Sequence, residues 1–196
     1  MQAEGRAPLS EGPPGPLEPA PASPPPPRRL VGLLASVALL SLGVDVVSKV
    51  IVVATLQPGQ VHALVPGVLD LLLTRNAGAA FSLGTGSTVV FTAVALAVVV
   101  AIVRFAPRLA SRAWAVVLGL LLGGALGNLS DRLVRAPGVG RGEVVDWVHL
   151  HHWPVFNIAD ACISVGAVMA VLLSLRGIPL TRDAPGGRSC TDDVPT

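Results

Sequence analysis

Apolar positions in this chain form four long stretches separated by polar or turn-rich segments. A helix needs about 20 residues to cross the hydrocarbon core of a bilayer, so a window of about 19 residues locates candidate spans. The window finds them at roughly residues 30–54, 88–106, 112–129 and 155–175. The pattern predicts four transmembrane helices and leaves no room for a fifth.

The segment between the first two predicted helices, about 55–87, has a different pattern. Q-P-G-Q indicates a turn, and V-H-A-L-V has strand-like alternation. The following run from Val68 to Leu83 predicts an apolar strand, a turn at Asn76–Gly78 and a second short strand. We therefore expect a small β element lying on the membrane surface. No internal repeat is visible, so an inverted-repeat transporter has little support.

Composition supports a membrane protein. The chain is 52% hydrophobic and only 13% charged, with a mean hydropathy of +0.67, which is too apolar for an ordinary soluble domain of this size. Residues 1–27 hold ten of the eighteen prolines and almost no large apolar side chain, as in segments that stay disordered. We expect an all-α membrane protein with a disordered tail at 1–27, a membrane domain at 28–177 and a second disordered tail at 178–196.

Arginine placement predicts the orientation. Eight arginines at or near the predicted span ends fall on one side of the membrane, and the positive-inside rule makes that side, with both termini, cytoplasmic. Four more lie in the opposite loops, where the positive-inside rule does not predict them, so we expect some of them to have a structural or catalytic role. The inner set is Arg28, Arg29, Arg104, Arg108, Arg112, Arg176, Arg182 and Arg188, and the outer set is Arg75, Arg132, Arg135 and Arg141.

Other features of charge and chemistry exclude several classes. The apolar run after Arg29 continues to about Ala54 without a small-residue cleavage site, which favours an uncleaved helix over a secretion signal. A net charge of +2 without a basic, aromatic-rich run gives no reason to expect nucleic acid. Cys162 and Cys190 offer no plausible disulfide and no metal-ligand spacing.

Polar residues gather at the predicted outer ends of the first and third helices. Asp45 and Lys49 are four residues apart on one helix face. In one interpretation the two side chains neutralise each other and the lysine extends to the membrane interface. In the other they support or line a functional site, and the two interpretations are compatible. In the third helix, Asn128 and Arg132 share a face and can both point inward; alternatively Asp131 and Arg132 meet water at the helix end. Small residues at 123, 124 and 127 predict close helix packing.

The fourth predicted helix carries Asp160 near its start, and an acid within a span is a functional-site hypothesis by default. Asn157 shares its face. Thirteen residues separate Asp160 from Asp146, which lies between apolar neighbours, and a short loop of that length can bring the two aspartates together. Two carboxylates close together in a partly apolar site share a proton, so one can activate water while the other polarises a carbonyl. That chemistry needs no metal or cofactor. Alternatively, Asp146 is a solvated loop acid and Asp160 pairs with Arg132 or Lys49.

Two other chemistries have weaker support. The outer histidines His149, His151 and His152 can be considered as zinc ligands, but no H-E-x-x-H or further ligand spacing accompanies them. Ser48 beside Lys49, or Ser82, can be considered as the nucleophile of a serine–lysine hydrolase, but no glycine-framed turn surrounds either serine. A proton- or ion-coupled transporter remains an alternative for a cavity lined by intramembrane polar residues.

Five motifs in order resemble those of the lipoprotein signal peptidases, also called signal peptidase II, over about residues 30–177. They are D-V-V-S-K, T-R-N-A-G-A-A-F-S, G-G-A-L-G-N-L-S-D-R, G-E-V-V-D-W and P-V-F-N-I-A-D. The resemblance implies a bacterial cytoplasmic-membrane aspartic peptidase that needs no metal or cofactor. Its substrates would be prolipoproteins whose cysteine bears a diacylglyceryl group, cut on the N-terminal side of that cysteine near the outer face.

Carried over by position, the resemblance makes Asp146 and Asp160 the catalytic pair. Six residues would hold the substrate or support the pair: Asp45, Lys49, Asn76, Asn128, Arg132 and Asn157. Val46 departs from the family, which often has Gln after the helix-one aspartate, and this puts one peripheral contact in doubt. The histidine-rich loop between the aspartates is a second departure, which bears on substrate contacts. The resemblance says nothing about oligomeric state.

Overall fold

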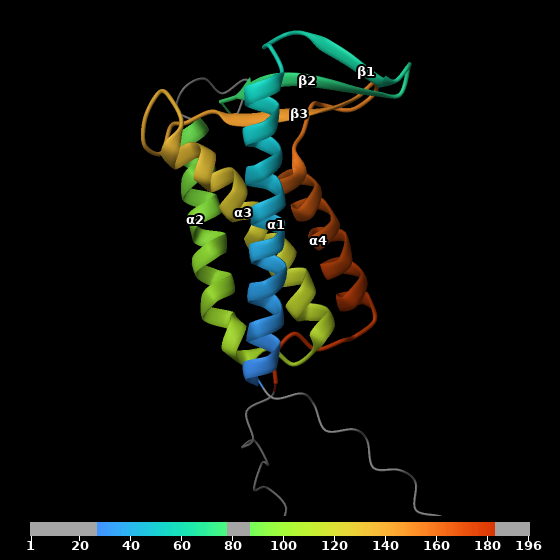
Figure 1. Ribbon diagram of the computed structural model, residues 1–196. Helices are drawn as coiled ribbons and strands as arrows, with labels where there is room; N and C mark the ends of the chain where they lie inside the picture. Colours follow the sequence, from blue (N-terminus) through green and yellow to red (C-terminus); the bar gives the residue numbers. More distant parts are fainter. Residues whose placement is uncertain (1–26, 78–86, 183–196) are drawn as a thin grey trace, which may run out of the picture.

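The structure is a computed structural model that describes residues 27–77 and 87–182. Its helices form a bundle in which α3 packs against each of the other three (Figure 1). A short 3-10 helix, η3, links α2 to α3. The bounds are α1 Pro27–Thr55, α2 Ser87–Phe105, η3 Ala106–Arg108, α3 Arg112–Val134 and α4 Ile158–Leu175. All four long helices are long and apolar enough to span a membrane, which confirms the four predicted spans.

Two of the differences between the helix boundaries and the predicted spans place polar residues of the candidate site. Helix α3 continues past residue 129 to Val134, so Asp131 lies inside it. A hydropathy window ends where charged residues begin, whereas these charged residues are buried by the fold. Helix α4 begins at Ile158 because Asn157 caps it: the Asn157 side chain accepts from the Asp160 backbone, and the Asp160 side chain accepts from the Asn157 backbone.

The β element draws on both connecting loops, which corrects the expectation of an all-α protein with strands in the first loop alone. Strands β1 (Val61–Val65) and β2 (Leu69–Asn76) pair antiparallel, and β3 (Val144–Leu150) pairs antiparallel with β2. The second strand expected after Asn76–Gly78 lies outside the described residues. Pairing between β2 and β3 joins segments far apart in the chain, which local alternation does not reveal.

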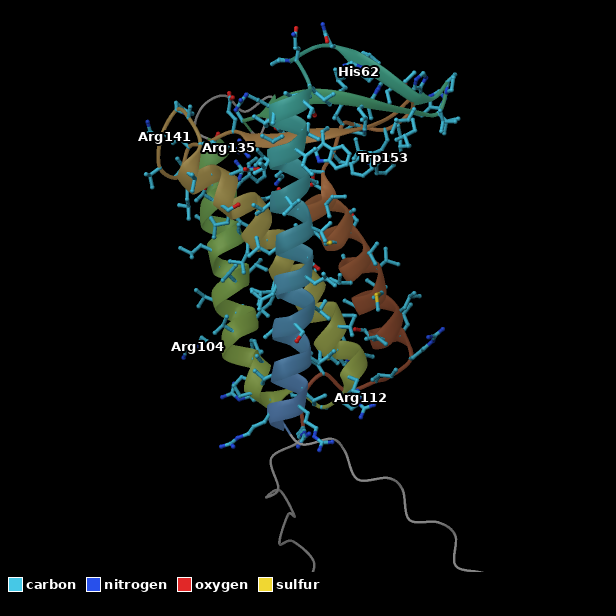
Figure 2. The ribbon with its side chains drawn as sticks, viewed as in Figure 1. His62, Arg104, Arg112, Arg135, Arg141 and Trp153 are labelled. Carbon is cyan, nitrogen blue, oxygen red and sulfur yellow. The ribbon has the colours of Figure 1, made fainter. Side chains whose placement is uncertain are left out.

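The sheet lies across one end of the bundle, and the β1–β2 hairpin extends sideways past the helices (Figure 1). Figure 2 shows Arg104 and Arg112 at the opposite end, with Arg135 and Arg141 at the sheet end. The chain past α4 folds back under the bundle: Trp114 Nε1 donates to the Ile178 carbonyl at 2.9 Å. Residues 178–182 are therefore packed against the domain, although the sequence assigned them to the tail.

Glycines on α3 set the helix spacing, as the small-residue pattern predicted. A Cβ at Gly123 would lie 2.6 Å from the Ala38 carbonyl of α1, and one at Gly124 would lie 2.5 Å from the Ala159 carbonyl of α4. A Cβ at Gly127 would lie 2.5 Å from Asp45 Oδ2 of α1 and 3.1 Å from the Ala159 Cβ of α4. These close approaches bring polar groups of α1, α3 and α4 together below the sheet.

The outer surface of the helices is strongly apolar. A continuous apolar surface of this kind favours contact with lipid over water. On α1 it includes Leu39, Leu40, Val47, Val50 and Ile51, and on α4 it includes Val165, Val168, Val171 and Leu172.

Candidate active site

Asp146 and Asp160 come to one region from different elements. Asp146 lies in β3 opposite Thr74 of β2, follows the buried Val144 and Val145, and is only 2% exposed. Asp160 is half-buried in the first turn of α4, where the capping box fixes its backbone and side chain. We call Asp146 and Asp160 the acid pair.

Asn157 contacts both members of the acid pair. Its Nδ2 donates to Asp146 Oδ1 at 2.6 Å, while its backbone N–H donates to Asp160 Oδ2 at 3.3 Å. The side chain is fully buried, so these hydrogen bonds are shielded from water. Asn157 therefore ties strand β3 to the first turn of α4.

Two further amides complete this network. Asn128 Nδ2 donates to Asp160 Oδ1 at 2.8 Å, and Asn128 Oδ1 accepts from Asn157 Nδ2 at 3.2 Å. Asn76, the last residue of β2, donates through Nδ2 to Asp146 Oδ2 at 3.1 Å. Each carboxylate of the acid pair thus accepts hydrogen bonds from amides on two different residues.

Burial and, next in size, the negative charge of Asp160 raise the pKa of Asp146 to about 6. Hydrogen bonds from Asn76 and Asn157 and the charge of Lys49 act in the opposite direction. Asp146 is consequently not a solvated loop acid. The other part of that alternative, a pair between Asp160 and a basic residue, also fails in the described part of the chain, where the partners of Asp160 are amides.

Asp45 and Lys49 of α1 form a buried ion pair, and Asp131 of α3 is a second partner of the lysine. Lys49 is 1% exposed, and its Nζ lies 2.8 Å from Asp45 Oδ2 and 2.8 Å from Asp131 Oδ2. Nζ also donates to Asn128 Oδ1 at 3.2 Å. Lys49 therefore does not reach toward the interface, and it connects the ion pairs to the amide network of the acid pair.

Arg132 is also turned into the protein. Its side chain is largely buried, its guanidinium carbon lies 5.6 Å from the centre of the Phe91 ring of α2, and the charges of Asp146 and Asp160 act on it. Its Nη1 is buried without a hydrogen-bond partner among the described residues. The inward orientation of Asn128 and Arg132 agrees with the prediction, whereas Asp131 is only 4% exposed and does not meet water.

Sequence reasoning missed Asp131 as part of this site. Asp131 stands just past the end of the apolar window, next to Arg132, a position at which an acid is expected to meet water. Its spacing to Arg135 contained a signal, since an acid four residues before a base on a helix predicts an ion pair. The structure contains that ion pair, but the contacts of Asp131 with Lys49 and β3 are long-range.

The histidines and serines show different contacts. His149 Nδ1 and His151 Nε2 lie 3.4 and 2.8 Å from Asp70 Oδ2, and within the described ranges no three His, Cys, Asp or Glu side chains are placed to hold a metal. Ser48 Oγ donates to the Asp45 carbonyl of its own helix at 2.8 Å. Lys49 is engaged by two carboxylates, so the serine–lysine hypothesis gains no support. Ser82 lies outside the described residues.

Comparison with known proteins places this architecture in a family. The model of the family described as Signal peptidase (SPase) II matches residues 37–176. The lipoprotein signal peptidase of Mycobacterium tuberculosis H37Rv is 47% identical over 157 residues, covering 80% of this chain and 77% of that protein. The lipoprotein signal peptidase of Rhodococcus jostii RHA1 is 47% identical over 165 residues, covering 82% of each.

Solved structures agree. A structure described as a bacterial membrane enzyme, determined in meso at 2.3 Å resolution, superposes with a TM-score of 0.66 and 27% identity over 79% of this chain and 94% of that one. A second, at 1.9 Å, gives the same TM-score with 29% identity over 74% and 94%. The chain belongs to the signal peptidase II family and is a multi-pass membrane peptidase. The transporter hypothesis is set aside on this ground.

Proposed function

We propose that the protein removes signal peptides from diacylglyceryl-modified prolipoproteins, cutting on the N-terminal side of the lipidated cysteine, with Asp146 and Asp160 as its catalytic residues. The observation that carries the proposal is the junction at Asn157, which hydrogen-bonds both carboxylates in a buried position. Family membership supports the reaction class. The geometry supports this particular pair of acids.

In this mechanism, one carboxylate of the acid pair removes a proton from water as the water oxygen attacks the scissile carbonyl carbon. The other, protonated, carboxyl donates a hydrogen bond and then its proton to the carbonyl oxygen. Collapse of the tetrahedral intermediate breaks the C–N bond: the proton taken from water passes to the leaving amine, and one hydroxyl of the intermediate returns its proton to the carboxylate that had donated it, which restores the acid pair. The raised pKa of Asp146 favours it as the carrier of the shared proton.

The other polar residues hold this arrangement or the substrate. Asn76, Asn128 and Asn157 orient the carboxylates, while Asp45 and Lys49 support them from α1. The Nη1 of Arg132 is buried beside the acid pair and has a free donor within the described part of the chain, which suits a peptide carbonyl of the substrate.

The sheet end faces outward in this proposal, and both termini are cytoplasmic. Arg104 and Arg112 lie at the opposite end (Figure 2), as the positive-inside rule requires. The substrate's acyl chains stay in the bilayer, so membrane anchoring supplies much of the positioning of the peptide bond. Residues 28–177 form the peptidase domain, and the segments at 1–27 and beyond 182 are proposed to be cytoplasmic tails.

Cleavage of a lipidated prolipoprotein by the purified full-length protein tests the proposal. Asp146→Asn and Asp160→Asn preserve side-chain size but remove the titratable group, so each is expected to lower the cleavage rate by on the order of 10³-fold or more. Helical content and elution as a single species serve as folding controls. Wild-type cleavage by both folded variants would show that another group performs the chemistry.

A further inference from the structure

The Asp131 side chain has three partners among the described residues, although no step of the proposed reaction uses it. Its Oδ2 lies 2.8 Å from Lys49 Nζ and accepts from the backbone N–H of Val145 at 3.2 Å, while Oδ1 pairs with Arg135 Nε. Val145 is the residue immediately before Asp146 and is fully buried. Asp131 therefore holds the backbone of β3 one residue away from a member of the acid pair.

Asp45 makes the matching contact on the other side of the site. Its Oδ1 accepts from the backbone N–H of Ala159 at 2.9 Å, and its Oδ2 lies 2.8 Å from Lys49 Nζ. Ala159 immediately precedes Asp160 and is fully buried. The residue before each acid thus donates its backbone N–H to a carboxylate that is held by the same lysine.

We propose that Asp131 is a positioning residue for the cleavage reaction and forms, with Lys49 and Asp45, one brace that sets the relative position of Asp146 and Asp160. The brace is defined by those three side chains, from α1 and α3. It connects β3 to the start of α4, the two elements that carry the acid pair. This inference rests on the proposed function.

Neutralising the charge of Lys49 does not by itself require Asp131 beside it. Asp45 is already 2.8 Å from Lys49, so a second buried acid exceeds what one lysine needs, and Arg135 at the rim supplies the additional positive charge. The contact that only Asp131 provides among these groups is the hydrogen bond to Val145. Val145 is fully buried, so its backbone N–H would be left without an acceptor and without water if Asp131 were lost, which makes this contact important for the position of β3.

The first test is Asp131→Asn in the full-length protein, with kcat and KM measured on a lipidated prolipoprotein. We expect kcat to fall by about 10- to 100-fold, because a displacement of about 1 Å at a reacting group has an effect of that size. KM should stay within about twofold, since substrate contacts are unchanged.

The pH profile separates positioning from a loss of folded protein. Asp146 is faced by Asp160 of α4, Lys49 of α1 and Arg132 of α3, besides the amides of Asn76 and Asn157. Removing the charge of Asp131 leaves Lys49 less neutralised, and loosening β3 admits water, so both effects lower the pKa of Asp146. The alkaline limb of activity should move to lower pH, whereas fewer folded molecules would scale the whole profile without moving it.

Two control variants match Asp131→Asn. Arg135→Gln removes the partner at the rim but leaves the Val145 and Lys49 contacts, and kcat should stay within about twofold of wild type. Asp70→Asn removes another buried acid, 4% exposed, that contacts His149 and His151 at the far part of β3. It should lower thermal stability without moving the pH profile.

Two results would overturn the positioning role. One is that Asp131→Asn is as active as Arg135→Gln, and the other is that its activity falls while its pH profile stays in place, as expected for Asp70→Asn. If Asp131→Asn does not fold, Asp131→Glu keeps the charge and displaces the carboxylate by one methylene. A lower kcat at unchanged KM then supports the role, and wild-type kcat contradicts it. If Asp146→Asn and Asp160→Asn are inactive but the Asp131 variant is fully active, the positioning role is refuted and the proposed function stands. If the acid-pair variants are active, the proposed function itself is refuted.

Discussion

Asp146 is predicted to reduce the stability of the protein at neutral pH while being required for its activity. Burial and Asp160 raise its pKa from an ordinary 3.8 to about 6, so its ionised form is less favourable in the folded protein than in the unfolded chain. The side chain is 2% exposed, so solvent screening is weak. At 1.36 kcal/mol for each pKa unit, the difference corresponds to about 3 kcal/mol.

The sign of this effect defines the pH window. A group whose pKa is raised on folding contributes stability below its unfolded pKa and loses that contribution as pH rises through the folded pKa. For Asp146 the window runs from 3.8 to about 6. In Asp146→Asn the titrating group is absent, so the stability of the variant relative to wild type should increase by about 3 kcal/mol between about pH 3 and about pH 7, a range that brackets this window.

Equilibrium unfolding of both proteins in one detergent, at several pH values, measures this difference. The introduced amide can still accept from Asn157, but its N–H₂ group meets the Nδ2 of Asn76, which donates to Asp146 in the wild type. That mismatch costs about 1–3 kcal/mol but does not depend on pH, so it cancels in the comparison between pH values. Parallel pH dependences of wild type and variant would refute the reasoning.

Three further outcomes are expected. Gly127→Ala should lower stability by about 1–3 kcal/mol and reduce cleavage, because its Cβ would lie 2.5 Å from Asp45 Oδ2; thermal unfolding and cleavage assays check this, and unchanged values contradict the packing account. Asn157→Ala should cost about 1 kcal/mol from the lost helix cap and move the alkaline limb of kcat/KM to higher pH, since the Asn157 hydrogen bond lowers the pKa of Asp146; an unmoved limb in the pH profile argues against this role. Ser48→Ala should weaken cleavage without abolishing it, because Ser48 Oγ bonds only to its own helix in the described structure; a complete loss would favour the serine–lysine mechanism.

The sequence predicts the four spans well because each is a nearly unbroken apolar run, and hydropathy is a local property. It places the end of α3 too early because Asp131 and Arg132 lower the local hydropathy, although packing buries both. Strand β3 escapes prediction because its pairing with β2 depends on residues about 70 positions away in the chain. Local sequence patterns identify helices and strands, whereas the contacts between them can be read only from the folded structure.

The same distinction applies to the candidate site. Spacing identifies Asp146 and Asp160 as unusual acids but leaves open whether they meet, and the resemblance of ordered motifs is what favoured the pair. The partners of Lys49 could be predicted only in part: Asp45 is one helical turn away, whereas Asp131 comes from another helix. The Val145 and Ala159 backbone donors leave no trace in residue type, since every such residue has an N–H.

We expect Asp146 and Asp160 to act as one catalytic unit. Cleavage rates of Asp146→Asn, Asp160→Asn and the double variant on a lipidated prolipoprotein test it most directly, because residues that act together have strongly non-additive effects. If the two acids act together, each single variant should fall to the same residual rate as the double variant. A single variant that keeps substantial activity, with a further multiplicative loss in the double variant, would contradict it.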